Sequence, residues 1–256
     1  MPIRLLILVL AISFSCSENK DSINKSINNA EIKPFFEGES TFENEISKIE
    51  HDTQLTEVTS LDYIDSEGKS WIVKAMVDNE MNVRKLTLPR TFTNGDNSIL
   101  SFYYLGARKF ASIEEYSRVR NEIYSKTLTK SFYDDSLQVF FSKKAYQTED
   151  LESEGNYKKT KSIAHSDVLA LAIINQEGDF QTKFQGFIEN LGKTYLIVGT
   201  DKYSSTLAFS EYSGLLKQLK ANEKKYIGQK LKVQFTTSTE ANGFTFQVLT
   251  DLSLVK

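Results

Sequence analysis

The alternation of apolar and polar residues along the middle of the chain predicts antiparallel β-structure. From Leu61 onward, apolar side chains recur at every second position, which places them on one face of an extended strand. Asn94-Gly95-Asp96 favours a hairpin turn, because its central positions accept a positive φ angle. A strand that reaches Pro89 is expected to end there. The strands expected in this region are 71–77, 83–88, 99–104 and 108–116.

Aromatic residues in this region recur at a fixed offset of 30 residues. The matched positions are Ser101-Phe102-Tyr103 with Ser131-Phe132-Tyr133, Phe110 with Phe140, and Tyr116 with Tyr146. The pattern indicates a hairpin unit whose returning strand carries aromatic residues on its buried face. A chance recurrence is the alternative, because serine and aromatic residues are frequent here. With only two copies, an antiparallel meander is favoured over a solenoid.

A polar stretch separates the meander from the rest of the chain. Residues 148–162 are mostly polar or charged, which is typical of a boundary. The next segment, 162–176, predicts a helix, because its apolar residues fall near a 3.6-residue period. Ser166-Asp167 is suited to cap this helix, and Gly178 to stop it. Because the segment is apolar on most sides, a buried strand is the alternative.

The last part of the chain has a recognisable order of elements. Residues 213–220 predict a short helix, and the other periodic segments predict strands. Three strands, a helix and two more strands resemble the order of an OB-type small barrel. The expected strands are 183–188, 194–198, 205–209, 231–235 and 244–248, the last two with Leu231, Val233, Phe235, Phe244 and Phe246 on the inner face. The predicted fold class is therefore mainly β (α+β), an N-terminal antiparallel β-hairpin meander followed by a C-terminal OB-like small β-barrel with one short helix.

Composition narrows the functional classes. Forty per cent of the 256 residues are hydrophobic, which is enough apolar material for a folded core. The 31 basic and 34 acidic residues leave a net charge of −3, which gives no general attraction to nucleic acid. One cysteine and two histidines exclude an intramolecular disulfide and most zinc sites. We therefore predict no metal and no cofactor.

The N-terminus carries the most informative motif. Arg4 precedes the apolar run Leu5–Ile12, and small residues lead to Cys16. As a helix this run spans about 12 Å, too short for a bilayer core of about 30 Å, whereas an export signal fits. The segment resembles the signal of bacterial lipoproteins. That resemblance implies that Cys16 receives a diacylglycerol and becomes the mature N-terminus.

The resemblance has consequences for location. It implies an exported protein held in the bacterial cell envelope by its lipid, most simply at the outer membrane. Glu18 and Asp21, just after Cys16, are compatible with display on the cell surface. The alternative is an ordinary signal peptide cleaved near Ser15, which would leave Cys16 as a free thiol. The predicted division is 1–15 signal peptide, 16–54 lipidated N-terminus and flexible tether, 55–150 β meander, 151–179 linker and helix, and 180–256 OB-like domain.

Two groups of charged residues are candidate sites. The first is a basic patch that is suited to a polyanion or an oligosaccharide, with a solvated lysine face as the alternative: Lys224, Lys225, Lys230 and Lys232. The second consists of paired acids that a glycosidase would need across a cleft: Glu114, Glu115, Asp134 and Asp135. Adjacent residues of a strand point to opposite faces, which favours solvated charges over such a pair. His165-Ser166-Asp167 is interpreted as a helix cap rather than a catalytic triad.

These observations lead to two functional hypotheses. The leading one is a non-catalytic envelope lipoprotein that binds, or structurally supports, a protein or glycan partner through its β surfaces. The alternative is a hydrolase of envelope polymers or glycans that uses paired carboxylates in an inter-domain groove. Nucleic acid is disfavoured as a partner, because the export signal takes the protein away from it.

Overall fold

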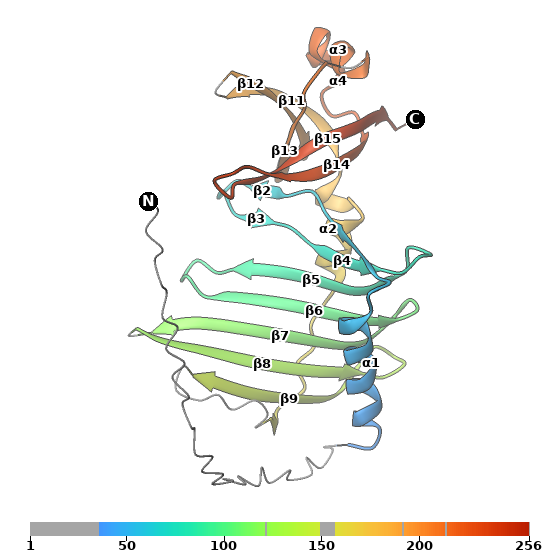
Figure 1. The fold of residues 1–256 in the computed structure, drawn as a ribbon, viewed down its shortest axis with the longest axis vertical. Helices are drawn as coiled ribbons and strands as arrows, with labels where there is room; N and C mark the ends of the chain where they lie inside the picture. The colour runs from blue at the N-terminus through green and yellow to red at the C-terminus, as the bar shows by residue number, and fades with distance from the viewer. Residues whose placement is uncertain (1–35, 121, 149–156, 191, 213, 256) are drawn as a thin grey trace, which may run out of the picture. The chain divides into compact units, whose positions relative to one another are not determined.

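The computed structural model describes residues 36–120, 122–148, 157–190, 192–212 and 214–255. Two largely antiparallel sheets dominate this part of the chain (Figure 1), which confirms the predicted mainly β class. Cys16 and the signal-like segment lie outside the described residues. Among the described helices, none is long and apolar enough to cross a bilayer.

The first sheet is an antiparallel meander of eight strands in the order β1-β4-β5-β6-β7-β8-β9-β10. Consecutive strands from β4 to β9 pair with one another, as the hairpin signals predicted. Gly95, with φ of 81°, lies in the predicted turn between β5 and β6. The strand bounds are β1 Thr56–Thr59, β4 Lys74–Val77, β5 Val83–Thr91, β6 Asn97–Leu105, β7 Arg108–Arg120, β8 Ile123–Tyr133, β9 Val139–Thr148 and β10 Lys158–Lys159.

Two strand ends differ from the prediction. The strand β5 continues through Pro89 to Thr91. Pro89 lies opposite Ile99 of β6, but β4 pairs with β5 only as far as Thr87, so at Pro89 the strand has a neighbour on one side only. The predicted strand 71–77 is interrupted, because Trp71 pairs in a separate short strand before β4 begins at Lys74.

The helix α1 (Glu39–His51) covers one face of the meander (Figure 1). This differs from the flexible tether that composition predicted for residues 16–54. Phe42, Ile46 and Ile49 follow a helical i, i+4, i+7 spacing and pack on the aromatic face of β6 to β9. Burial of these side chains against the sheet stabilises the helix, although the composition of the segment is mostly polar.

A second segment crosses the opposite face of the meander. Residues 160–167, named the strap, are irregular and lead into the helix α2 (Val168–Ile174). The predicted helix over 162–176 is therefore shorter at both ends. The strap replaces its first turn, because the strap backbone bonds to the sheet instead of to itself: the Thr160 N–H donates to the Ser142 carbonyl at 3.0 Å.

The second sheet curls into a half-barrel with the strand order predicted for an OB-like domain. Its order is β11-β12-β13-β15-β14, and β13 and β15 run parallel where Ala208 faces Val248. A bridge between Lys183 and Lys230 joins β14 back to β11, which gives the Greek-key closure of this fold type. Two short helices separate β13 from β14, where one was predicted. The bounds are β11 Lys183–Asn190, β12 Lys193–Gly199, β13 Tyr203–Ala208, α3 Gly214–Ala221, α4 Glu223–Tyr226, β14 Leu231–Thr239 and β15 Thr245–Leu254.

A β-bulge changes which residues of β15 face the barrel interior. Phe244 and Phe246 were predicted to face inward, but Phe244 is 62% exposed and stacks on Phe246 with ring centroids 6.1 Å apart. The pairing shifts by one residue between Gln234 and Phe235 of β14. Beyond that shift the alternation on β15 is inverted, so the predicted inner residues lie outside.

The meander and the barrel share contacts within the described residues. The short strands β2 (Tyr63–Asp65) and β3 (Ser70–Trp71) pair with each other, and β2 pairs with β13. The Tyr63 hydroxyl donates to the Phe180 carbonyl, in the 3₁₀ turn Gly178–Phe180, at 2.6 Å. One hydrophobic core includes residues of the meander, α2 and the barrel. The predicted boundary between two domains, near residues 151–179, stays a prediction.

The repeat of 30 residues corresponds to the two hairpins β6–β7 and β8–β9. Its matched residues are not structurally equivalent throughout, because Phe102 packs on the α2 side of the sheet and Phe132 on the α1 side. The prediction of a buried face was wrong for the second copy. Phe140 is 43% exposed and Tyr146 is 65% exposed.

Candidate functional site

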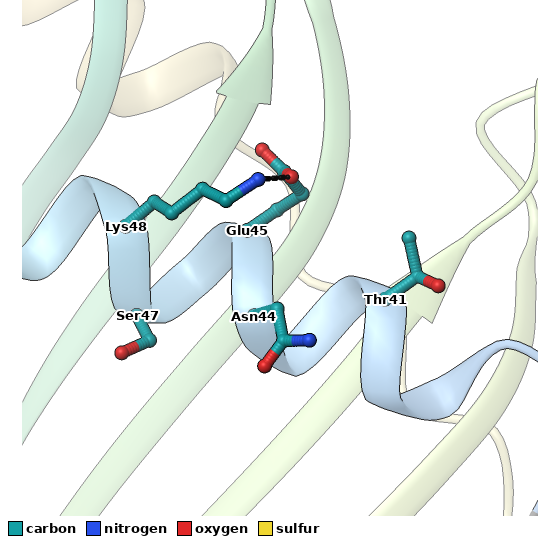
Figure 2. A pocket seen from close by; sticks show the side chains of 5 residues that line it. All are labelled: Thr41, Asn44, Glu45, Ser47 and Lys48. Carbon is teal, nitrogen blue, oxygen red and sulfur yellow. Dashed lines mark hydrogen bonds and ion pairs between the residues drawn. The ribbon is translucent and has the colours of Figure 1, made fainter.

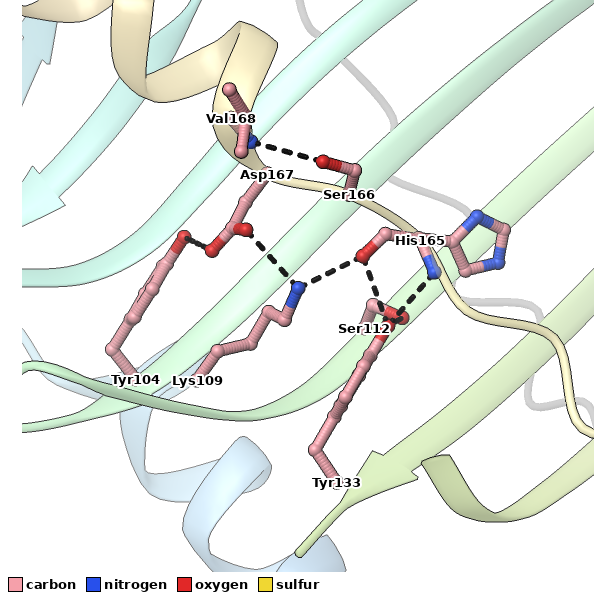
Figure 3. Close-up of polar contacts among 8 residues, drawn as sticks. All are labelled: Tyr104, Lys109, Ser112, Tyr133, His165, Ser166, Asp167 and Val168. Carbon is pink, nitrogen blue, oxygen red and sulfur yellow. Dashed lines mark hydrogen bonds and ion pairs between the residues drawn. The ribbon is translucent and has the colours of Figure 1, made fainter. Parts of the chain in front are cut away.

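The strap is held to the meander by a buried polar network (Figure 3). Lys109 Nζ donates to the His165 carbonyl at 2.8 Å and to Asp167 Oδ1 at 3.1 Å. Tyr104 donates to the other Asp167 oxygen at 2.7 Å. The Tyr133 hydroxyl accepts the His165 N–H at 3.0 Å and donates to its carbonyl at 3.2 Å. Asp167 occupies the predicted N-cap position of α2, but its side chain binds the sheet instead of capping the helix. The Ser166 hydroxyl accepts the Val168 N–H at 3.4 Å.

Small hydroxyl side chains complete this network. Ser112, Ser131 and Ser142 are neighbours across β7, β8 and β9, and all three are buried. Ser112 bonds to the Tyr133 hydroxyl at 3.0 Å, and Ser142 accepts the N–H of Ile163 at 3.1 Å. Serine leaves room above the sheet for the strap, and its hydroxyl satisfies backbone groups that would otherwise be buried unpaired.

An open groove continues along the same face of the sheet beyond the strap. Two cross-strand rows form it, because Glu114, Thr129 and Lys144 are register neighbours, and so are Tyr116, Thr127 and Tyr146. Arg118 extends the β7 side. The groove of about 220 Å³ is lined by Glu114, Tyr116, Arg118, Thr127, Thr129, Lys144 and Tyr146. We name it the β7–β9 groove.

The shape of the groove follows from residue size on three adjacent strands. Thr127 and Thr129 of β8 form a hydroxyl-bearing floor, and larger side chains of β7 and β9 form the two walls. Neighbouring strands lie about 4.8 Å apart, so the backbones of the walls are about 10 Å apart. The resulting trough is open to solvent and runs along β8. It has the width for one extended chain, with an aromatic ring on each side.

The β7 wall is fixed by ion pairs behind it. Tyr116 donates a short hydrogen bond to Asp96, and Arg120 donates to the same carboxylate at 2.9 Å. The bond from Tyr116, with help from Arg120, lowers the pKa of Asp96, and the same bond raises the pKa of Tyr116. Glu114 accepts from Arg90 at 2.6 Å. Both acids are therefore paired with an arginine of the same chain, and the ring of Tyr116 is held in place.

His165 is part of the strap near this wall. Burial lowers the pKa of its imidazole, Glu114 opposes that effect, and Arg90 and Lys109 add to it. Its Nε2 atom is buried and has no hydrogen-bond partner in the described part of the chain. The imidazole is therefore neutral at pH 7, because a proton on Nε2 would be buried without an acceptor.

The four acids considered for catalysis do not converge. Glu114 lines the groove, whereas Glu115 lies on the opposite face and pairs with Lys126. Asp134 accepts two backbone N–H groups within the β8–β9 turn, and Asp135 pairs with Arg108. The groove lining thus contains one carboxylate, where two would be needed for acid–base hydrolysis of a glycosidic bond.

The predicted lysine patch lies on the barrel, away from the lining of the groove. Lys224 and Lys225 belong to α4, Lys230 forms the closing bridge to β11, and Lys232 lies on β14. All four are exposed, and the alternation with buried Leu231 follows the prediction. Their proposed role in binding stays a prediction. The predicted lipid site, Cys16, lies outside the described residues.

A second hollow, of about 340 Å³, lies along α1 (Figure 2). Thr41, Asn44, Glu45, Ser47 and Lys48 line it, and all belong to this one helix. Lys48 and Glu45 pair with each other at 2.5 Å. Without a facing wall this hollow offers little enclosure for a ligand, so the β7–β9 groove is the better candidate.

Sequence reasoning found part of this groove for a different reason. Tyr116 and Tyr146 were noted as members of a repeat, but they were assigned to a buried face. The signal that could have identified the groove is the polar run of threonines on β8, Thr127 and Thr129, between strands that carry tyrosines. In the described residues, no group of three or more His, Cys, Asp or Glu side chains is placed to hold a metal ion.

The chain was compared with protein families, with characterised proteins and with solved structures. No protein-family model, characterised protein or solved structure matches the chain.

Proposed function

We propose that the protein is a non-catalytic lipoprotein of the bacterial cell envelope that binds a glycan in the β7–β9 groove. The observation that carries the proposal is the arrangement of Tyr116 and Tyr146 on either side of a threonine floor. The C–H face of a sugar ring packs on an aromatic ring, and its hydroxyls exchange hydrogen bonds with threonine hydroxyls. A volume of about 220 Å³ suits one sugar unit of a longer chain that extends along the open trough.

Binding is favoured over hydrolysis by the charges of the groove. Its single carboxylate, Glu114, is held by Arg90 at 2.6 Å and by Ser98 at 3.3 Å. A general acid must present a proton-donating carboxyl group to the glycosidic oxygen, whereas Glu114 Oε1 already accepts hydrogen bonds from Arg90 and Ser98. Glu114 is therefore suited to accept a hydrogen bond from a sugar hydroxyl.

A glycan array with the purified full-length protein tests the proposal. We expect binding to a subset of glycans, and we expect Tyr146→Ala to weaken it about tenfold, the loss of roughly one stacking contact. Tyr124→Ala is the matched control, because Tyr124 is an exposed tyrosine of β8 on the other face of the sheet. Binding to no glycan, equal loss in both variants, or cleavage of any bound glycan would contradict the proposal.

The envelope location is tested separately. We expect the wild-type protein to incorporate palmitate and to fractionate with membranes, and the Cys16→Ala variant to do neither. Protease treatment of intact cells then distinguishes display on the surface from a position inside the envelope. A Cys16→Ala variant that remains with the membrane would remove the lipid anchor from the proposal.

A further inference from the structure

Basic side chains on the two faces of the meander differ in whether they are paired with carboxylates. On the α1 side, each lysine near the helix has a carboxylate: Lys85 pairs with Glu50 at 2.8 Å, and Lys130 pairs with Glu43 at 2.7 Å. Burial raises the pKa of Glu43, but hydrogen bonds from Lys130 and Lys143 outweigh this effect and hold the pKa below its ordinary value. The Glu43 carboxylate therefore stays charged. Lys143, on the same face, is likewise paired with Glu43, at 2.7 Å. These lysines are therefore all paired with carboxylates of the helix α1.

The groove side has basic residues without such partners. Arg118 and Lys144 line the groove, and Lys158 of β10 lies beside Lys144 in register. Arg118 donates to the Ser125 hydroxyl at 3.2 Å, and Lys144 lies 5.2 Å from the ring centroid of Tyr146. Across the described ranges, none of these three side chains forms an ion pair with a carboxylate, whereas the acid in the groove is already neutralised.

From this asymmetry we infer that the β7–β9 groove selects acidic glycans, whose sugar carboxylates pair with Arg118 and Lys144. The inference rests on the proposed glycan-binding function and specifies its ligand class. Arg118 extends the β7 wall, and Lys144 stands on the β9 wall, so the two cations flank the trough from opposite sides. A chain that lies along β8 therefore meets one cation on each side.

The other side chains of the groove complete the fit to a uronic acid. Its carboxylate reaches a cation while its ring packs on Tyr116 or Tyr146 and its hydroxyls meet Thr127 and Glu114. Arginine is the stronger partner, because its planar guanidinium matches a carboxylate with two parallel hydrogen bonds. Since the groove is open to water, the charge pairing gives selectivity that weakens with added salt.

Calorimetric titration of the full-length protein with matched probes tests the inference. The probes are short oligomers of polygalacturonate, alginate and hyaluronan, each compared with its carboxyl-reduced form, which keeps the sugar ring and loses the charge. We expect at least one acidic oligomer to bind about tenfold or more tightly than its reduced form, with an affinity that falls as salt rises. Arg118→Gln and Lys144→Gln should each weaken this binding about tenfold.

Lys126→Gln provides the matched control. It removes the same charge from the same hairpin, but Lys126 lies on the other face and pairs with Glu115. It should bind the acidic oligomer like the wild type. Equal loss in all three variants, or equally tight binding of a polyglutamate peptide, would overturn the inference.

The outcomes separate this inference from the proposed function. Binding of acidic and reduced oligomers with equal affinity, lost in Tyr146→Ala, would overturn the selectivity and retain glycan binding. Absence of binding to every oligomer and every glycan of the array would overturn both.

Discussion

Replacing Tyr133 by Phe removes one hydroxyl and leaves the aromatic ring in place. That hydroxyl makes three contacts, with the Ser112 hydroxyl at 3.0 Å and with the N–H and carbonyl of His165 at 3.0 and 3.2 Å. The His165 carbonyl keeps its bond from Lys109, and Ser112 is able to rotate. The His165 N–H, however, loses its partner at a site from which the strap excludes water.

The expected loss is about 2–3 kcal/mol of unfolding free energy, from one net hydrogen bond plus the cost of an unpaired buried group. For a domain of this size, that corresponds to a decrease of roughly 4–12 °C in Tm. Urea unfolding followed by fluorescence of the single tryptophan, Trp71, measures the global loss. Hydrogen exchange at the His165 amide measures local loosening of the strap.

Tyr146→Phe is the control for this experiment. Tyr146 is 65% exposed, so removal of its hydroxyl should change the unfolding free energy by less than about 0.5 kcal/mol. If Tyr133→Phe unfolds like the wild type and its His165 amide stays equally protected, the strap is not held by this hydroxyl.

Three further predictions concern other supports of the fold. Lys109→Met should cost about 3 kcal/mol in urea unfolding, because the partly buried Asp167 carboxylate loses its cation and the His165 carbonyl loses a hydrogen bond; a loss under about 1 kcal/mol would contradict this. The His165 pKa lies below its ordinary 6.5, so the unfolded chain binds a proton that the folded one does not. Stability should therefore fall as pH decreases from 7 through 6.5, and His165→Gln should flatten this slope in pH-dependent unfolding. Gly199→Ala should lower the free energy of unfolding by about 3 kcal/mol, because its Cβ would lie 2.2 Å from a backbone oxygen and its φ angle is +141°. Gly214→Ala is the control, because its Cβ meets open space, and its thermal unfolding should match that of the wild type.

The predictability of the strands has a simple physical basis. Along residues 83–88, buried Leu86 and Leu88 alternate with more accessible neighbours, and the same alternation of apolar and polar residues is visible in the sequence. Turn residues such as Gly95 are equally local, since they report a φ angle and need no distant partner. The order of strands and helix that resembles an OB-type barrel could be predicted from the sequence for the same reason, because each element has its own local pattern.

The errors arose where a distant contact or a single inserted residue decided the outcome. The helix α1 looked like a tether, because its few apolar residues are stabilised only by the sheet that they cover. Phe244 looked buried, because the one-residue bulge opposite Phe235 inverts the alternation of β15 and leaves no sign in composition. The strap looked like the start of a helix, because its backbone partners, Ser142 and Tyr133, lie on other strands.

The candidate site shows the same division. Local periodicity in the sequence was sufficient to predict antiparallel hairpins over residues 101–146, but it assigned Tyr146 to a buried face. The position of Thr127 between Tyr116 and Tyr146, and the open face beyond the strap, follow from contacts that the folded chain makes. Register across three strands and the coverage of a sheet face depend on contacts between segments far apart in the chain. Alternation along a single strand does not specify those contacts.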